Sequence, residues 1–539
     1  MKKYFNISAL TEGKKSCLMY ALSAVLFSMG FNFRSCWIFS WLFFVPLSLN
    51  LFSSNMTSKR VFYSLFCFFF PFYVSCYSWL VNLYPLDFAG LGNVESVLVI
   101  IAGLTLIPLI HSLEMSFSVW IFNYLSFKIN NGVVRCLAIS FGYVFGEFLQ
   151  SVGYLAFPWA RIYVSQIGVL PILQSAKLFG SYFITFIVVM FNCLAAFAII
   201  NKKKASKYIA FALTVFVVNY AFGCVAISYT EKEYNSENEV TAAVLQGNVS
   251  SYDKWGTLQS SYERYLELSL EASDYCDSEN INTDFALIPE TAFPTTAMEI
   301  SDGRIEKTGS AFVVSKKMSE IMKCPVVSGV FTKIDDDEYN SLACIGQNGE
   351  IYGLYHKQKL VPFGEFVPYR KLIETLIPFL SDINMLSEDL SCGDGAEIVE
   401  FNGIKLANLV CFDSVFPSAV RKQIINGAEI ISISTNDSWY KQSAALEQHA
   451  SHAVMRAIEN NRPVVRCANT GISMLIEPTG KIVDKTEIDK KAFLVGSLHK
   501  SSVVTPYTHV GDITLMFCSF YLAILLFVNL YRNIRRKAH

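Results

Sequence analysis

Residues 405–413 read KLANLVCFD, and this stretch decides how the second half of the chain folds. A short apolar run that ends in a single cysteine is typical of a strand buried in a sheet. A second run of this kind, FALIPE at 285–290, ends in a glutamate. Because the chemistry of an open α/β sheet usually lies beyond the carboxyl ends of its strands, Cys411 and Glu290 are placed as a catalytic pair would be.

The segment around these runs, 237–500, alternates short β-rich stretches with helical patterns. The sequence predicts strands at 241–249, 285–288, 325–331, 405–411, 428–435 and 463–467. It predicts helices at 255–273, 418–426 and 447–461. This alternation, over a length ordinary for one domain, predicts a single α/β domain with a buried sheet.

Apolar runs long enough to cross a bilayer flank this domain on both sides. They lie near 17–33, 35–54, 61–82, 96–113, 134–156, 170–200, 206–228 and 511–530, with an additional interfacial stretch conceivable at 117–127. We therefore expect an N-terminal membrane domain of about seven helices at 1–228, the catalytic domain at 237–500 and a C-terminal transmembrane helix at 511–530. A hydrophobic fraction of 53% agrees, since it is high for a soluble protein.

If the spans alternate in direction, the short loops on one side of the membrane carry little beyond Arg34 and Arg161, and the other basic residues next to the spans fall on the opposite side. They are Lys2, Lys3, Lys14, Lys15, Lys59, Arg60, Lys128, Arg135, Lys202, Lys203, Lys204, Lys207, Arg532, Arg535, Arg536 and Lys537. The positive-inside rule then places both termini in the cytoplasm and the domain outside, which in a Gram-negative cell is the periplasmic side of the inner membrane. A cleaved signal peptide in place of the first span is the alternative, but more spans follow immediately.

Charge and cysteine usage exclude several classes of protein. The net charge is −1, so the chain has no basic face for nucleic acid. Its 14 cysteines are scattered singly, which argues against a zinc site or a disulfide framework. Those inside spans, such as Cys67 and Cys193, are expected to be small buried hydrophobes. No metal or diffusible cofactor is implied.

The residue types at the strand ends suit covalent catalysis. A thiol is a good nucleophile only as a thiolate, so Cys411 needs a base or a positive charge beside it. Glu290 could take the proton, and Lys357, within YHKQKLVPFGE at 355–365, could hold the thiolate and then an oxyanion. Glu365 could pair with Lys357 or share the base work. From spacing alone, each residue could also have an ordinary structural role without catalysis. Cys411 could be a core cysteine, Glu290 a solvated loop residue and Lys357 a surface lysine.

Several motifs, and the order in which they occur along the chain, favour the catalytic interpretation. IPETAFP (288–294), YHKQKLVPFGEFVP (355–368), LVCFD (409–413), STNDSWY (434–440) and NTGIS (469–473) resemble the nitrilase superfamily. The LVPFGEFVP segment, together with QGNV (246–249) and FPWARIYVSQ (157–166), is similar in particular to the apolipoprotein N-acyltransferase family. The resemblance covers nearly the whole chain, including the arrangement of spans around the domain.

The resemblance implies a fold and an activity. The fold would be a polytopic α-helical membrane protein with an α/β extracytoplasmic domain, a nitrilase-like αββα sandwich. The activity would be transfer of an acyl chain from a membrane phospholipid to the α-amino group of the diacylglyceryl-cysteine of an apolipoprotein. The resemblance makes Glu290 the base, Lys357 the lysine, Glu365 a second glutamate and Cys411 the nucleophile that carries the acyl group as a thioester.

Further residues are assigned by the same resemblance. Trp255 would lie over the cleft and contact acyl chains, with local packing as the alternative. Glu147, in a predicted span, would contact substrate or serve as a buried hydrogen-bonding residue. Phe412 and Asp413 stand where the family commonly has Tyr and Glu, so Asp413 would support the site with a carboxylate one methylene shorter. Gln150 stands where an Arg is often found.

Two other functions stay open. A membrane-tethered amidase could use the same three residues with water as the acceptor, although eight spans exceed what tethering requires. A catalytically inactive membrane scaffold is the second alternative, and the intact catalytic positions argue against it. The expected partners are a phospholipid acyl donor, a diacylglyceryl lipoprotein acceptor and the bilayer, with the protein acting as a monomer.

Overall fold

The computed structural model describes residues 14–53, 57–86, 90–129, 131–234, 238–249, 258–301, 304–307, 309–376 and 389–537. The chain divides into two compact units. The helical unit comprises Met1–Val81, Leu98–Ala226 and Val510–His539, and the sheet unit comprises Asn82–Val97 and Ile227–His509. The sheet unit thus contains a short segment from the N-terminal part of the chain in addition to the domain expected at 237–500.

The sheet unit contains two sheets built from the predicted strands and from others between them. The first has eight strands: β1 (Glu239–Gln246), β2 (Phe285–Leu287), β3 (Thr296–Ser301), β4 (Arg304–Glu306), β5 (Val326–Ile334), β6 (Asp337–Ile345), β7 (Ile351–His356) and β14 (Ala492–His499). The second has six: β8 (Ile398–Phe401), β9 (Ile404–Val410), β10 (Ile430–Thr435), β11 (Val464–Ala468), β12 (Met474–Ile476) and β13 (Ile482–Lys485). Every predicted strand corresponds to a strand of the structure.

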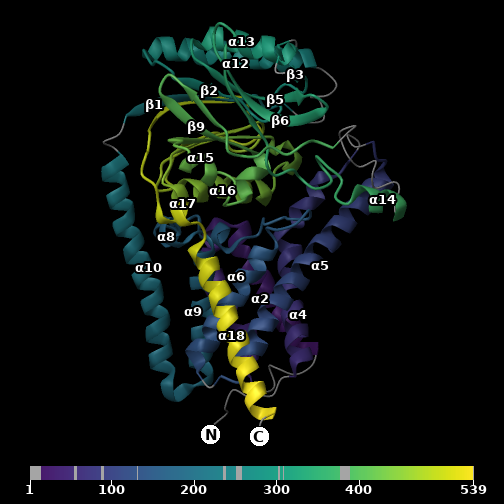
Figure 1. The fold of residues 1–539 in the computed structure, drawn as a ribbon, viewed down its shortest axis with the longest axis vertical. Helices are drawn as coiled ribbons and strands as arrows, with labels where there is room; N and C mark the ends of the chain where they lie inside the picture. The colour runs from purple at the N-terminus through teal and green to yellow at the C-terminus, as the bar shows by residue number, and fades with distance from the viewer. Residues whose placement is uncertain are drawn as a thin grey trace. The chain divides into compact units, whose positions relative to one another are not determined.

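The two sheets pack face to face, and helices cover their outer faces. The long helices α12 (Leu258–Glu279) and α13 (Ser310–Met322) lie on the first sheet, while α15 (Arg421–Ile425) and α16 (Ala444–Asn460) lie on the second (Figure 1). One apolar cluster fills the space between the sheets, and another fills the space between the first sheet and its helices. The predicted αββα sandwich is therefore confirmed.

Parallel pairing brings the ends of the central strands together. β9, β10 and β11 run parallel in the second sheet, and β1, β2 and β5 run parallel in the first. The Ser434 hydroxyl on β10 donates a hydrogen bond at 2.8 Å to the carbonyl oxygen of Ile288, just after β2. This bond between the sheets brings the turn after β2 close to the ends of β9 and β10.

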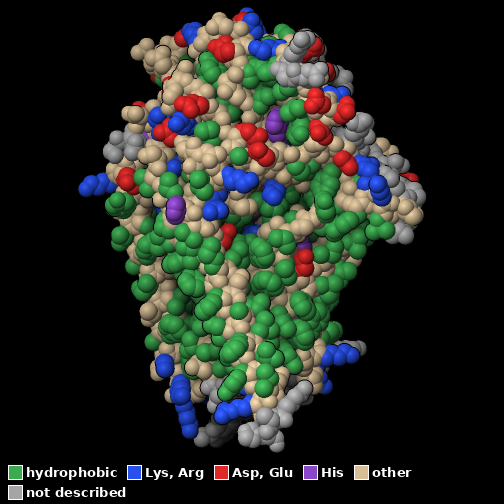
Figure 2. All heavy atoms as spheres, in the orientation of Figure 1, with side chains coloured by type: hydrophobic (Ala, Val, Ile, Leu, Met, Phe, Trp, Pro, Cys, Tyr) green, Lys and Arg blue, Asp and Glu red, His purple; other side chains and the backbone are tan. Residues whose placement is uncertain are grey.

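The helical unit contains long apolar helices. They are α2 (Lys14–Asn32), α4 (Ser58–Cys76), α5 (Asn93–Ser126), α6 (Gly132–Leu149), α9 (Tyr182–Ile200), α10 (Ala205–Tyr234) and α18 (Ile513–Lys537). Within the described residues, six helical segments are long and apolar enough to cross a membrane, and the helix at 16–32 is a shorter apolar one. Hydrophobic side chains cover the face of this unit seen in Figure 2, which suits contact with lipid. The protein is a membrane protein.

The run at 35–54, predicted as one helical span, is broken in the structure. It forms a 3-10 helix, η1 (Arg34–Trp41), followed by a short helix, α3 (Val45–Leu51), with Pro46 in its first turn. Asn192 on α9 bridges the break, because it donates to the Ser40 carbonyl at 3.0 Å and accepts from the Phe44 N–H at 3.2 Å. A neighbouring helix thus satisfies the backbone groups that the break exposes, as an apolar environment requires.

The stretch at 117–127, considered as an additional interfacial segment, is instead part of α5, a single helix of 34 residues. Apolar residues continue through it without a turn signal, so nothing ends the helix before Ser126. The predicted helix count before the sheet unit is therefore changed by the broken run at 35–54 and not by an extra segment.

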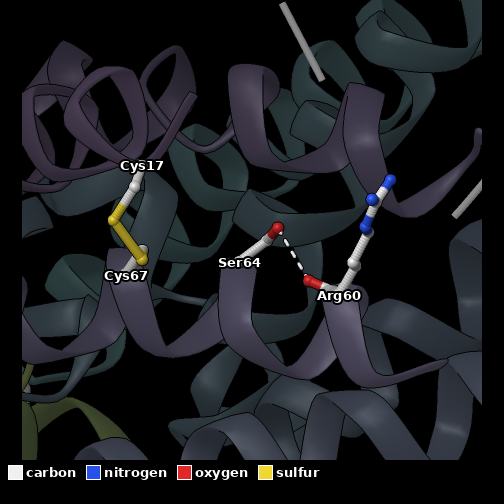
Figure 3. Close-up of a disulfide and its surroundings, with 4 residues drawn as sticks. All are labelled: Cys17, Arg60, Ser64 and Cys67. Carbon is white, nitrogen blue, oxygen red and sulfur yellow. Dashed lines mark hydrogen bonds between the residues drawn. A yellow bond between two sulfur atoms is a disulfide. The ribbon is translucent and has the colours of Figure 1, made fainter. Parts of the chain in front are cut away.

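A disulfide joins the first two long helices, which the scattered cysteines did not suggest. Cys17 on α2 and Cys67 on α4 are bonded, with their Cα atoms 5.5 Å apart (Figure 3). The expectation that Cys67 is only a small buried hydrophobe is wrong, because packing of α2 against α4 brings together residues 50 positions apart in sequence. One turn away, the Ser64 hydroxyl donates to the Arg60 carbonyl at 2.9 Å.

We expect this bond to stabilise the helical unit. A cross-link closing a loop of this size contributes roughly 4 kcal/mol to the free energy of unfolding in the chain-entropy description. Cys67→Ser should therefore lower the unfolding temperature of the detergent-solubilised protein, and a reductant should lower that of the wild type to the same value. An equal effect of reductant on both proteins would contradict this role.

The exposed basic side chains of the helical unit lie at one end of it. They are Lys59, Arg60, Lys128, Lys202, Lys203, Lys204, Lys207, Arg532 and Arg535. Contacts near the helix ends agree: Asn529 on α18 donates to the Leu125 carbonyl on α5, and Phe52 packs against Phe197 of α9. Figure 2 shows Lys and Arg gathered where α18 ends and α10 begins.

Candidate active site

Glu290 lies on the turn after β2 with its carboxylate buried. Its Oε1 accepts hydrogen bonds from Lys357 Nζ at 2.9 Å and Asn340 Nδ2 at 2.8 Å, and its Oε2 accepts from the Asn436 N–H at 3.0 Å. Burial would raise the pKa of this carboxyl, but the Lys357 ammonium and the hydrogen bonds outweigh it and hold the pKa below its usual value. Glu290 is thus ionised at neutral pH and able to accept a proton.

Lys357 follows β7, and only 1% of its side chain is exposed. Its Nζ donates to Glu290 Oε1 at 2.9 Å and to Glu365 Oε1 at 2.8 Å. Burial would lower the pKa of Lys357, but the two carboxylates hold it well above its usual value. Glu365 is itself fixed, since its Oε2 accepts from the Val361 N–H at 2.8 Å. The result is a buried cation held between two carboxylates.

Cys411 directly follows β9 and begins the 3-10 helix η7 (Cys411–Val415). Its φ of +48° lies in the left-handed region, which an ordinary side chain adopts only when its surroundings impose it. Burial and the Glu290 carboxylate raise the pKa of the thiol well above its usual value, while the Lys357 ammonium and a hydrogen bond with Thr435 lower it. The resting thiol is therefore protonated and lies within the electrostatic reach of both Glu290 and Lys357.

Asp413 forms hydrogen bonds both with residues next to Lys357 and with the end of β9, which precedes Cys411. Its Oδ1 accepts from the backbone N–H groups of Gln358 at 3.2 Å and Lys359 at 2.7 Å. Its Oδ2 accepts from the Tyr355 hydroxyl at 2.9 Å and the Val410 N–H at 3.0 Å. Burial raises the pKa of this fully buried carboxyl to about 6. The predicted supporting position is thus occupied by a carboxylate that ties the residues flanking Lys357 to the end of β9.

Asp413→Asn should disturb this arrangement without touching the three candidate catalytic side chains. An amide offers one acceptor oxygen where four donors converge, so at least one buried N–H loses its partner at a cost of about 1–3 kcal/mol. We expect a lower unfolding temperature and slower acylation of Cys411, with Asp413→Glu retaining more of both. Equal acylation rates for Asp413→Asn and wild type, measured by intact mass, would contradict a role in positioning Lys357.

The structure also brings polar residues to the site that sequence reasoning missed. Asn340 on β6 donates to both Glu290 and Glu365, the latter at 3.0 Å. Behind Cys411, Asp437 accepts from His449 Nδ1 at 2.8 Å and from Arg466 at 2.9 Å. Burial would raise the pKa of Asp437, but Arg466 and His449 hold it far below its usual value. Of these, only Asp437 carried a usable signal, because it closely follows the predicted strand at 428–435.

Comparison with known proteins agrees with this geometry. The carbon-nitrogen hydrolase family model matches residues 241–504, the range that holds the candidate catalytic residues. The apolipoprotein N-acyltransferase N-terminal domain matches residues 23–194, so the two models together match more than half of the chain. The chain belongs to the apolipoprotein N-acyltransferase family.

Curated relatives carry the family's name. An apolipoprotein N-acyltransferase of Geobacter metallireducens is 28% identical over 67% of this chain and 68% of its own length. That of Aquifex aeolicus is 26% identical over 90% of this chain and all of its own length. Among solved structures, the nitrilase superfamily member Nit3 of Saccharomyces cerevisiae matches with 17% identity and a TM-score of 0.37, over 48% of this chain and 90% of that chain.

Glu147 lies on α6, in the range matched by the N-terminal model of the apolipoprotein N-acyltransferase family. Its Oε1 accepts from the Ile162 N–H at 3.0 Å and its Oε2 from the Thr185 hydroxyl at 2.7 Å. Both oxygens of this buried side chain thus hold neighbouring segments of the helical unit. The contacts favour the hydrogen-bonding role over the substrate role. Trp255 lies outside the described residues.

A cavity of about 600 Å³ opens beside the site within the sheet unit. The described residues that line it all have polar or charged side chains: Asn82, Asn248, Ser438, Lys441, Gln442, Thr470 and Asp489. It adjoins the site through Ser438, whose hydroxyl donates to Asn436 Oδ1 at 2.9 Å, while the Asn436 N–H binds Glu290.

Proposed function

We propose that this family member transfers an acyl chain from a membrane phospholipid to the α-amino group of the diacylglyceryl-cysteine of apolipoproteins, through a thioester on Cys411. The observation that carries the proposal is the buried contact between the Glu290 carboxylate and the Lys357 ammonium, both of which act on the Cys411 thiol. A base and a cation beside one thiol are what a cysteine nucleophile requires.

In the first step, the Cys411 sulfur attacks the ester carbonyl of the phospholipid. The thiol proton passes to Glu290 as the sulfur–carbon bond forms, and the negative charge that develops on the carbonyl oxygen is stabilised by Lys357. Collapse of this intermediate breaks the carbon–oxygen bond of the ester. The proton on Glu290 then passes to the departing oxygen, which releases a lysophospholipid and leaves an acyl thioester.

In the second step, the α-amino group of the acceptor attacks the thioester carbonyl. Glu290 takes a proton from the amine, the carbon–sulfur bond breaks, and the proton returns to the sulfur of Cys411. The products are an amide and the free thiol, so atoms and protons balance over the cycle. The active site thus has one base for both half-reactions, and no step needs a metal or a diffusible cofactor.

We further propose that the protein lies in the inner membrane with both termini in the cytoplasm and the sheet unit in the periplasm. Exposed basic side chains at one end of the helical unit support this orientation, because such residues are enriched on the cytoplasmic side. The lipid-facing helices also suit an enzyme whose two substrates both stay in the bilayer. We expect it to act as a monomer.

The test is intact-mass analysis of the purified protein incubated with phospholipid in detergent. We expect an acyl-sized mass increase that hydroxylamine removes, that is absent from Cys411→Ala, and that passes to a synthetic diacylated lipopeptide. Release of free fatty acid without transfer to the lipopeptide would favour a membrane-tethered amidase. Absence of any adduct, together with no thiol-reactive labelling at Cys411, would favour a catalytically inactive scaffold.

A further inference from the structure

The backbone carbonyl of Cys411 is held by two side chains from the far side of the site. The Ser414 hydroxyl donates to it at 2.7 Å, and His449 Nε2, on α16, lies 3.2 Å from it. His449 is completely buried. Its other ring nitrogen, Nδ1, lies 2.8 Å from Asp437 Oδ1. Since a carbonyl and a carboxylate only accept, both contacts are hydrogen bonds when each ring nitrogen carries a proton.

The partners of Asp437 fix this histidine firmly. Asp437 Oδ2 accepts from Arg466 at 2.9 Å, and its Oδ1 also accepts from the Thr435 hydroxyl at 2.9 Å. None of the three charged or ionisable side chains, Asp437, His449 and Arg466, is exposed. These hydrogen bonds favour one arrangement of the buried side chains, because moving His449 or Asp437 would leave further polar groups unsatisfied.

These contacts act at the residue whose backbone is strained. The left-handed φ of Cys411 is unfavourable for a side chain and persists only where neighbouring groups impose it. The two donors fix the peptide that follows the Cys411 Cα atom, and Asp413 holds the Val410 N–H before it. The direction in which the Cys411 side chain leaves the backbone therefore depends on this peptide staying in place.

We propose that His449, oriented by Asp437 and Arg466, is a positioning residue that holds the Cys411 backbone and so aims the thiol at Glu290 and Lys357. This inference rests on the proposed function for its effect on acyl transfer. The alignment of the Cys411 thiol by His449 does not depend on which substrate the enzyme uses.

Two substitutions separate the two hydrogen bonds of His449. A glutamine reaches about as far as Nε2 and can still donate to the Cys411 carbonyl, whereas an asparagine reaches about as far as Nδ1 and can bond only to Asp437. We expect His449→Gln to form the thioester at close to the wild-type rate. We expect His449→Asn to form it about 100-fold more slowly, the loss that a displacement of about 1 Å can cause. The apparent KM for phospholipid should be unchanged in both.

The measurement is the rate of thioester formation by quenched intact mass, with a synthetic phospholipid in detergent, divided by the fraction of folded protein. His452→Asn, on the same helix, is the matched control for losing a buried histidine and should retain the wild-type rate per folded molecule. Equal rates for His449→Asn and His449→Gln would overturn the proposal. So would a loss in His449→Asn that only matches its loss of folded protein.

Alkylation of Cys411 by iodoacetamide separates this inference from the proposed function. If the wild type forms no thioester, the proposed function fails. The positioning role then still predicts that the alkylation rate in His449→Asn differs from that of the wild type, while His449→Gln resembles the wild type. Identical alkylation of all three proteins would overturn the positioning role independently of any lipid substrate.

Discussion

Glu290→Gln should slow thioester formation on Cys411 by about a thousandfold, within the range that removing a general base causes. The amide keeps the shape of the side chain and one acceptor oxygen, so Lys357 and Asn340 retain a partner. It cannot take the thiol proton, and the thiol, whose pKa burial holds well above its usual value, stays protonated. Quenched intact-mass measurements with excess phospholipid give the rate.

Glu365→Gln is the matched control for this substitution. It removes the second carboxylate that contacts Lys357 but leaves the Glu290–Lys357 contact in place. Because Glu290 and not Glu365 is the proposed base, we expect Glu365→Gln to keep more activity than Glu290→Gln. A loss in Glu290→Gln smaller than tenfold would contradict its role as the base.

Lys357→Met should remove both activity and stability. The substitution leaves the buried Glu290 and the partly buried Glu365 together without their cation, and breaking a buried ion pair in this way typically costs about 3–5 kcal/mol. The developing oxyanion also loses its positive partner, which we expect to reduce thioester formation by at least about 100-fold. Lys359→Met, two residues further along the chain and outside the two carboxylate contacts of Lys357, is the control and should retain the wild-type rate.

The pH dependence of stability gives a second measurement for the lysine. In the wild type the pKa of Glu290 is lowered on folding, so its contribution is present above the unfolded pKa and is lost as pH falls through the folded pKa. In Lys357→Met the cation is gone, so burial determines the pKa shift of Glu290. The pKa of Glu290 then rises on folding, and protonation of Glu290 removes the cost of burying its negative charge. The difference in unfolding temperature should therefore be largest near neutral pH and narrow toward acid. A difference in unfolding temperature between wild type and Lys357→Met that stays constant with pH would contradict this role of Lys357.

The sequence predicted the parts of the site that depend on local pattern. Glu290, Lys357 and Cys411 each follow a strand, and family motifs surround each of them, so their positions could be read along the chain. His449 and Arg466 could not be found in this way. They lie inside a helix and a strand. His449 reaches Cys411 only because α16 packs against η7, and Arg466 reaches the site only through Asp437 and His449. Such contacts depend on tertiary packing, which no local pattern records.

The membrane part shows the same limit. Hydropathy located the apolar runs, since bilayer length and composition leave a strong signal. It could not show that the run at 35–54 is broken, because the break depends on Asn192 from a distant helix bonding the exposed backbone groups. Likewise, nothing in the spacing of Cys17 and Cys67 indicated that α2 and α4 would bring them within bonding distance.

The ends of the sheet unit's main segment lie next to each other. β1, near its start, pairs antiparallel with β14, near its end, from Glu239 opposite His499 to Gln246 opposite Ala492. At the same edge, the His499 N–H donates to the hydroxyl of Tyr234, the last residue of α10, at 2.9 Å. A domain that the chain enters and leaves at one edge can be gained by a gene in a single insertion between two helices. Such an insertion would need no rearrangement of the sheet unit or of the helices on either side of it.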